Sequence, residues 1–324
     1  MKRIIISRTD SIGDVVLTLP MCGALKKKFP GIQILFIGRT YTGPIIRCCK
    51  YVDEFIDWDA SKDKSPQEQI DILKNLHADC IVHVFPRKEL LWLAKRAGIP
   101  MRIATGRRLQ TITKVNKLVF FTRKNSALHE AQLNFKLLKP LGIDVIPSLE
   151  EITLNYGLKP KGLLRKEISE LIQHDKLNII LHPKSKGSAV EWGVANFAKL
   201  TALLPVDKTR IFITGTAAEG EAIRRECDLR TLPVVDLTGQ LTLDELIAFI
   251  DACDVLVAAS TGPLHIAAAL GKKAIGLYTP KRPMHAGRWA PLGKYARVLI
   301  AKQHPQKGEF LDISPSDVVH AILQ

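Results

Sequence analysis

The chain has 324 residues, of which 46% are hydrophobic and 24% charged, and its formal net charge is +15 at pH 7. This length suits two domains with full hydrophobic cores, and no apolar run is long enough to cross a membrane. The excess of basic residues is compatible with a nucleic acid, an anionic lipid surface or a phosphorylated substrate as partner. No nucleic-acid-binding signature accompanies the charge, so we expect no nucleic-acid partner.

The apolar run near the start of the chain, residues 4–6, is too short for a signal peptide, and residues 3–7 are expected to form a strand. The chain's cysteines are scattered without metal-ligand spacing: Cys22, Cys48, Cys49, Cys80, Cys227 and Cys253. We therefore expect a cytoplasmic protein with mostly free, buried thiols and no bound metal.

Strand-like and helix-like runs alternate from the first residue onward. Strands are expected at 3–7, 33–38, 54–58, 80–85, 102–105 and 118–121. Helices are expected at 14–29, 43–49 and 66–76, in a segment ending at 97, and at 129–141, where Gly142 closes the helix. Strands separated by helices predict a parallel sheet that is covered on both faces.

The alternation of strand-like and helix-like runs is interrupted over residues 143–160, which contain Pro147, Gly157 and Pro160. We interpret 147–160 as a linker between an N-terminal domain, 1–146, and a C-terminal domain, 161–311. The second domain restarts the pattern, with strands expected at 177–182, 210–214, 234–237, 254–258 and 274–278. Its helices are expected at 163–173, 196–204, 219–227, 243–252 and 263–270, and the segment 312–324 contributes a final helix at 317–323.

The predicted fold class is therefore α/β, with two similar doubly wound domains facing a cleft. Ligands of open parallel sheets collect at the carboxyl ends of the strands, so the polar loops at those ends are the first candidates for a site.

The segment 258–271 is the strongest such candidate. It holds a strand-to-helix turn, Ser260-Thr261-Gly262-Pro263, with His265 about one turn into the helix. Ser260 or Thr261 can cap the helix, and the free N–H groups of a helix N-terminus suit a phosphate. A capped helix with a core histidine is the alternative.

Asp14 is the candidate for acid–base chemistry. It falls near the start of the helix after the first strand, in Asp10-Ser11-Ile12-Gly13-Asp14. The carboxylate can serve as a general base that takes a proton from an acceptor hydroxyl. Alternatively, Asp10, Ser11 or Asp14 only caps the helix.

Two further loops of the second domain carry suitable groups. The loop containing Lys184, Ser185, Lys186 and Ser188 is rich in hydroxyls and cations and would fit a diphosphate, or it is an ordinary basic loop. Glu219 follows the next strand, where an acid can accept from ribose hydroxyls or favour a helix N-terminus. The spacing Asp57-Trp58-Asp59 matches a D-x-D metal motif, which we interpret as coincidence.

These loops together resemble glycosyltransferase family 9, the heptosyltransferases of bacterial lipopolysaccharide core synthesis. The resemblance runs almost end to end and rests on Asp10-Ser11-Ile12-Gly13-Asp14 with Leu19-Pro20, on His182-Pro183 and Trp192, on Gly215 with Glu219, and on Ser260-Thr261-Gly262-Pro263-Leu264-His265 with the Ala-Ala-Ala-Leu-Gly that ends at Gly271. The family implies the GT-B fold, two Rossmann-like domains with a C-terminal helix that often packs back on the N-terminal domain.

The resemblance also implies a function: an inverting, metal-independent transferase that moves a sugar, foremost heptose from ADP-heptose, to a lipopolysaccharide core or related surface-glycan acceptor. No cofactor is implied, since the nucleotide sugar is a substrate. The expected partners are that donor, an anionic lipid-linked acceptor and the inner leaflet of the membrane, where the protein would be peripheral. The alternative is a nucleotide-sugar-binding family member with a different donor or with catalysis lost.

The family's roles can be carried over by motif. Asp14 matches the catalytic base, and Glu219 matches the ribose-binding acid. The donor side further comprises Lys184, Ser185, Lys186, Ser188, Ser260, Thr261, Gly262, Pro263 and His265. The acceptor side comprises Asp10, Ser11, Arg107, Arg108 and His129.

Two positions depart from the family. Ser260 stands where the family usually has Asp, and Val190 stands where it usually has a Lys that helps neutralise the donor. Lys184 or Lys186 could take the place of that lysine.

Overall fold

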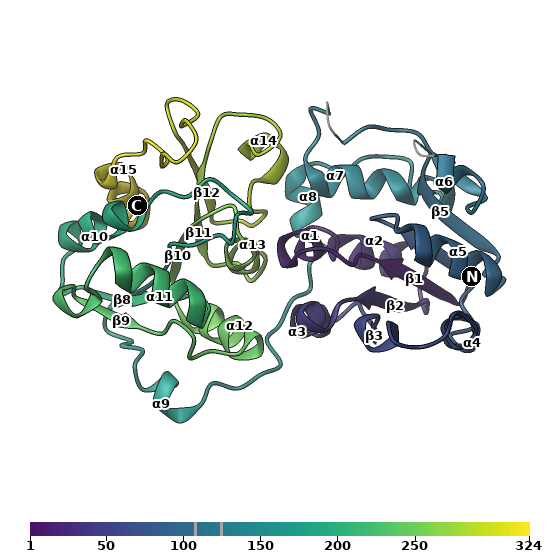
Figure 1. Ribbon diagram of the computed structural model, residues 1–324, viewed down its shortest axis with the longest axis horizontal. Helices are drawn as coiled ribbons and strands as arrows, with labels where there is room; N and C mark the ends of the chain where they lie inside the picture. The colour runs from purple at the N-terminus through teal and green to yellow at the C-terminus, as the bar shows by residue number, and fades with distance from the viewer. Residues whose placement is uncertain (107–108, 124–125) are drawn as a thin grey trace. The chain divides into compact units, whose positions relative to one another are not determined.

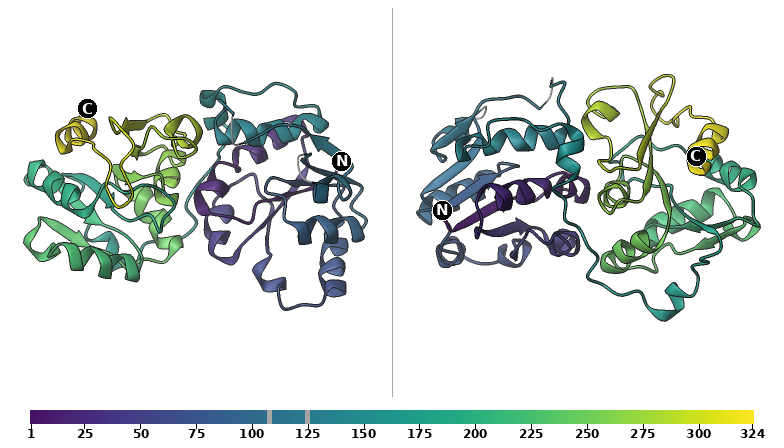
Figure 2. Two further views of the ribbon diagram at one scale, coloured as in Figure 1. Left: turned by 45° about the horizontal axis from the view of Figure 1, so that its top comes forward. Right: turned by 180° about the vertical axis from the view of Figure 1, so that it is seen from behind.

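The computed structural model describes residues 1–106, 109–123 and 126–324. The chain folds into two compact units, Met1–Lys159 and Pro160–Gln324, which are drawn in Figures 1 and 2. None of the helices in the described ranges is long and apolar enough to cross a membrane.

Unit 1 contains a six-stranded parallel sheet in the order β3-β2-β1-β4-β5-β6. Its strands are β1 Arg3–Ser7, β2 Gln33–Gly38, β3 Glu54–Asp57, β4 Cys80–His83, β5 Met101–Thr105 and β6 Lys117–Val119. Its helices are α1 Ile12–Val16, α2 Pro20–Lys28, α3 Gly43–Arg47, α4 Pro66–Asn75, α5 Lys88–Arg96, α6 Leu109–Ile112, α7 Glu130–Phe135 and α8 Leu149–Thr153. Helices α4 and α5 bury their apolar stripes against one face of the sheet, while α2 contacts α7.

The start of unit 1 differs from the single helix expected at 14–29, because α1 and α2 are separate helices. Pro20 separates them, since proline cannot donate an amide hydrogen bond and its ring clashes with a preceding helical carbonyl. The helix expected at 129–141 is α7 followed by a 3₁₀ helix, Lys136–Leu141, that contains Pro140. Gly142 closes it in the left-handed conformation, with φ of 75°.

Unit 2 repeats the architecture, with a parallel sheet in the order β12-β11-β10-β7-β8-β9. Its strands are β7 Leu177–His182, β8 Thr209–Ile213, β9 Val234–Asp236, β10 Val255–Ala259, β11 Lys273–Tyr278 and β12 Ala296–Ile300. Its helices are α9 Lys166–Ser169, α10 Val194–Leu203, α11 Ala217–Glu226, α12 Leu243–Ala252, α13 Gly262–Ala269, α14 Ala286–Trp289 and α15 Pro315–Leu323. Counted from its own first strand, each unit has the order 3-2-1-4-5-6 that defines the Rossmann fold.

Several boundaries differ from expectation. The helix expected at 163–173 is only α9, and Leu163 is 91% exposed rather than packed in an apolar stripe. Strand β12 and helix α8 were not predicted; α8 lies within the segment interpreted as the linker, and unit 1 continues to Lys159. Helix α15 packs on α10 and β11 of unit 2, so its apolar face is used inside that unit.

Each sheet has one place where neighbouring strands send their following loops in opposite directions, between β1 and β4 in unit 1 and between β7 and β10 in unit 2. Ligands of such sheets bind beside these positions, at the carboxyl ends of the strands. Asp14 follows β1, and the turn at Ser260 follows β10, so both predicted motifs lie at such a position.

Candidate functional site

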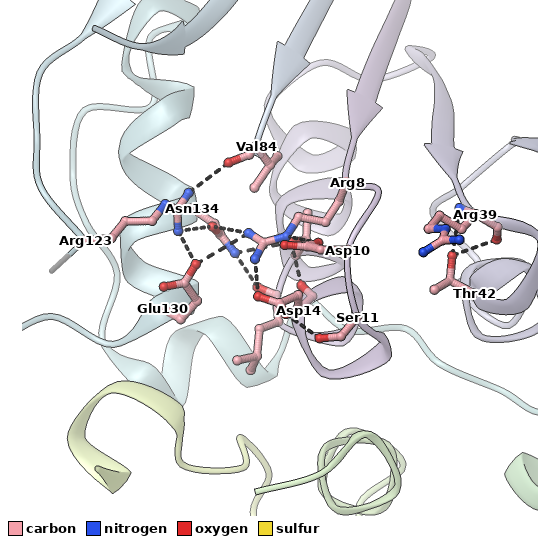
Figure 3. A network of polar contacts seen from close by, with 12 residues as sticks. Arg8, Asp10, Ser11, Asp14, Arg39, Thr42, Val84, Arg123, Glu130 and Asn134 are labelled. Carbon is pink, nitrogen blue, oxygen red and sulfur yellow. Dashed lines mark hydrogen bonds and ion pairs between the residues drawn. The ribbon is translucent and has the colours of Figure 1, made fainter. Parts of the chain in front are cut away.

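Asp14 lies in the first turn of α1, and its carboxylate is held at both oxygens. Oδ1 accepts a hydrogen bond from the Arg8 guanidinium, and Oδ2 accepts one from the Ser11 hydroxyl (Figure 3). Ser11 is the N-cap residue, and its hydroxyl binds the Asp14 carboxylate instead of a helix amide. The Asp14 side chain is 17% exposed, so solvent or a substrate can reach it.

Arg8 follows β1 directly, and its side chain is only 2% exposed. The guanidinium donates in three directions: from Nε to Asp10 at 2.7 Å, from Nη2 to Asp14, and from Nη1 toward Glu130 at 3.4 Å. Nη1 also donates to the Asn134 side-chain oxygen at 3.3 Å. The orientation of Asp14 is therefore tied to residues of α7 that lie more than 100 positions away in the sequence.

A second arginine, Arg123, joins the ion-paired side chains of Arg8, Asp10, Asp14 and Glu130, and these residues form the Asp14 cluster. Arg123 pairs with Glu130, donates to Asn134 Oδ1 at 3.0 Å and donates to the carbonyl oxygen of Val84 at 3.0 Å (Figure 3). The Asn134 amide in turn donates to the carbonyl oxygen of Leu17 at 3.1 Å. Two arginines thus face three carboxylates, those of Asp10, Asp14 and Glu130, and the pairing of opposite charges makes burial of these groups tolerable.

The electrostatics of the cluster follow from burial and pairing. Burial alone would lower the pKa of the Arg8 guanidinium, but the charges of Asp14, Asp10 and Glu130 outweigh it and raise that pKa above its ordinary value. Burial raises the pKa of the Asp10 carboxyl, against the opposing charge of Arg8 and with a contribution from the negative charge of Asp14. Arg8 is therefore a permanent cation beside Asp14.

The structure places the residues predicted for the acceptor side in different surroundings. Asp10 and Ser11 lie within the cluster. His129 is buried and caps α7, where its Nδ1 accepts the Ala131 amide at 3.2 Å. Arg107 and Arg108 lie outside the described residues.

Sequence reasoning missed Arg8, Arg123 and Glu130. The only local signal is an arginine directly after a buried strand, and the contacts with α7 carry no signature in the sequence.

The two carboxylates of the D-x-D motif, Asp57 and Asp59, are bound by neighbouring protein groups. Asp57 Oδ1 accepts hydrogen bonds from the Thr40 hydroxyl and the Asp59 amide, each at 3.0 Å. Asp59 pairs with Arg39 at 3.3 Å and with Lys62 at 2.5 Å. Within the described ranges, no group of three or more His, Cys, Asp and Glu residues is placed to hold a metal ion.

In unit 2, helix α13 begins at Gly262 with Pro263 in its first turn. Thr261 is the N-cap residue, but its side chain does not cap the helix. The Thr261 hydroxyl oxygen is buried, and among the described residues it has no hydrogen-bond partner. His265 is 3% exposed. A helix N-terminus with an unused hydroxyl beside it can accept an anion.

The neighbouring loop after β7 folds around Glu191. Ser185 donates its amide to the Glu191 carboxylate at 2.8 Å and its hydroxyl at 3.0 Å. Lys184 pairs with Glu226 at 2.6 Å and with Glu191 at 3.4 Å. Lys184 is therefore already neutralised within the loop, whereas Lys186 and Ser188 are exposed.

The Ser188 hydroxyl donates to the Ser260 carbonyl at 3.4 Å, which joins this loop to the α13 turn. Val190 packs against the core of unit 2.

Glu219 lies in the first turn of α11 and forms a capping box with Thr216. Its Oε2 accepts the Thr216 amide at 2.7 Å and the Thr216 hydroxyl at 2.9 Å. The glutamate is thus fixed at the carboxyl end of β8 through one of its two carboxylate oxygens.

Two Rossmann-like units with the same strand order define the GT-B fold. The family model for glycosyltransferase family 9 (heptosyltransferase) matches residues 92–314, so the chain belongs to this family and is a glycosyltransferase.

Individual relatives agree with this assignment. Lipopolysaccharide heptosyltransferase 3 of Escherichia coli K12 is 23% identical over 328 residues, which span 95% of this chain and 93% of that protein. The family 9 glycosyl transferase of Veillonella parvula has a TM-score of 0.80 at 19% identity, covering 99% of this chain and 95% of that one. Escherichia coli heptosyltransferase WaaC, solved with ADP, has a TM-score of 0.75 at 18% identity over 99% of both chains. At these identities the two structures show a common fold.

Proposed function

We propose that this chain transfers heptose from ADP-heptose to a sugar of a lipopolysaccharide core or related surface glycan, with inversion and without a metal. In this proposal the acceptor binds unit 1 and the donor binds unit 2. The observation that carries the proposal is the Asp14 carboxylate, which is accessible, follows the first strand of unit 1 and is fixed by Arg8 and Ser11.

The reaction is a single displacement at the anomeric carbon. The acceptor oxygen bonds to that carbon while its proton passes to Asp14, and the bond from the anomeric carbon to the diphosphate oxygen breaks. ADP leaves with the bonding electrons. The carboxylate supplies the base, and the remaining requirement is stabilisation of charge on the leaving group.

Unit 2 offers groups that can stabilise the negative charge on the leaving diphosphate. Support comes from the N-terminus of α13, from the Thr261 hydroxyl, which has no partner in the described part of the chain, and from the exposed Lys186 and Ser188. Glu219 would accept hydrogen bonds from the ribose hydroxyls. Lys184 contributes little in this scheme, since Glu226 and Glu191 already hold its ammonium group.

The net charge of +15 supports an anionic, lipid-linked acceptor at the inner leaflet of the membrane. Sedimentation with vesicles that contain an anionic phospholipid tests this part. We expect binding that falls with added salt, and no binding at low salt would contradict peripheral association.

The enzymatic proposal is tested by measuring nucleoside diphosphate release from a panel of nucleotide sugars with a lipopolysaccharide core acceptor. We expect turnover with ADP-heptose, and a loss of about 10²–10⁴-fold in Asp14→Ala. Asp53→Asn is the control, since Asp53 pairs with Lys26 and accepts the Ile34 amide outside the Asp14 cluster.

Each part of the proposal has its own refutation. Full activity of Asp14→Ala would reject this base. Turnover with a different nucleotide sugar alone would reject ADP-heptose. Nucleotide binding without transfer to any acceptor would identify a binding protein that has lost catalysis.

A further inference from the structure

Arg8 is buried, permanently charged and bonded to the residue proposed as the base. We propose that Arg8, itself held by Glu130 and Asn134, is a positioning residue that keeps the Asp14 carboxylate in one orientation for sugar transfer. This inference rests on the proposed function, because it gives Arg8 a role only if Asp14 accepts the proton.

Exposure separates the roles of the two residues. The Asp14 side chain is 17% exposed, whereas that of Arg8 is 2% and that of Glu130 is 1%. A substrate can therefore touch Asp14 but not the buried arginine or the glutamate behind it. An effect of Arg8 on the reaction therefore passes through the accessible groups that it holds, which are Asp14 and the 19% exposed Asp10.

The geometry fixes the plane of the guanidinium. Its three nitrogens donate to acceptors from separate parts of unit 1: Nε to Asp10 in the loop after β1, Nη2 to Asp14 on α1, and Nη1 to Glu130 and Asn134 on α7. Arginine can satisfy such a planar, forked set of acceptors, whereas lysine presents a single point charge. The orientation of Nη2, and hence of the Asp14 carboxylate, is therefore set from the α7 side.

The residues of α7 that hold Arg8 are themselves held in place. Arg123 holds Glu130 and Asn134 and is anchored on the carbonyl of Val84, directly after β4. Figure 3 shows this continuous path from Val84 through Arg123 and Glu130 to Arg8 and Asp14. Strands β1 and β4 are neighbours in the sheet, so the path spans the position where a ligand is expected.

Arg8 is also the main restraint on the Asp14 carboxylate. Among the described residues, the hydrogen bonds of this carboxylate are those from the Arg8 guanidinium to Oδ1 and from the Ser11 hydroxyl to Oδ2. Without Arg8, the carboxylate keeps only the Ser11 contact and can rotate.

Two substitutions separate the charge of Arg8 from its planar set of donors. Arg8→Met removes both, so we expect kcat to fall by about 10²-fold while the KM for ADP-heptose stays unchanged. Arg8→Lys keeps the charge but loses the planar donors. Its kcat should still fall roughly tenfold or more, because misplacing a catalytic group by 1 Å can cost about 10²-fold.

The assay uses the full chain with ADP-heptose and the core acceptor, and the Kd for ADP is measured in parallel. ADP affinity should be unchanged in both variants, since the nucleotide is assigned to unit 2. Asp53→Asn is the matched control, because it removes another ion pair of unit 1 and reports the effect of lower stability alone.

The outcomes distinguish this inference from the proposed function. An active Asp14→Asn variant would reject Asp14 as the base and, with it, the premise of this inference. An inactive Asp14→Asn, together with a kcat loss in Arg8→Met or Arg8→Lys no larger than in Asp53→Asn, would overturn only the role of Arg8. If Arg8→Met does not fold, the kcat and ADP affinity of Arg8→Lys decide alone.

Discussion

Glu219 has two possible roles, one in helix capping and one in ligand binding, and substitutions can separate them. In Glu219→Gln the amide oxygen can still accept the Thr216 amide, so the capping box is retained without the negative charge. We expect this variant to remain as stable as the wild type while its affinity for ADP falls about tenfold.

The magnitude follows from the hydrogen bonds. A bond to a charged acceptor contributes about 1.5–3 kcal/mol and a bond between neutral groups about 0.5–1.5 kcal/mol. The difference of about 1.4 kcal/mol corresponds to one factor of ten in Kd. Thr216→Ala should instead cost about 1 kcal/mol of stability through the lost cap, with Glu219 still charged.

Helix α12 offers a matched control. Thr242 and Glu245 form the same capping box there, with the Thr242 amide 2.9 Å from Glu245 Oε2. Titration calorimetry with ADP and thermal unfolding of Glu219→Gln, Thr216→Ala and Thr242→Ala separate affinity from stability. Wild-type affinity in Glu219→Gln, or an equal loss of affinity in Thr242→Ala, would refute the assignment of Glu219 to the ribose.

Two further predictions concern the sheet ends and the packing of α13. His83 is fully buried, and its burial, together with the charge of Arg102, lowers its pKa to about 3. The unfolded chain therefore binds a proton at this histidine at a higher pH than the folded chain does. The stability that neutral His83 contributes above about pH 6.5 is lost as the pH falls toward 3. Urea unfolding should show a loss of about 2 kcal/mol from this group at pH 5, and His83→Leu should remove that part of the pH dependence; an unchanged slope would contradict it. A Cβ at Gly293 would lie 2.1 Å from the Ala268 carbonyl oxygen of α13, so Gly293→Ala should cost about 1–3 kcal/mol and lower the melting temperature. In Gly162→Ala the new Cβ would meet no atom closer than 3.3 Å, and an equal loss in that variant would show that the contact with α13 is not the cause.

Much of the fold could be predicted from the sequence because buried parallel strands are short, continuous apolar runs. The strands expected at 3–7, 33–38 and 177–182 have those bounds in the structure. Strand β12 was missed because it lies at a sheet edge and is partly exposed, which weakens the apolar pattern. The break at Pro20 was available from the sequence, since proline disfavours a continuous helix.

The alternation of strands and helices, the loops that end the strands and the position of Asp14 among them could be predicted from the amino-acid sequence, because they follow from local periodicity and short motifs. The contacts that hold those groups come from tertiary packing. Packing pairs Lys184 with Glu226 and Glu191, gives the Thr261 hydroxyl no partner among the described residues and joins Arg8 to Glu130. Arg8 and Glu130 are 122 positions apart, and such a contact depends on how strands and helices pack rather than on any local pattern.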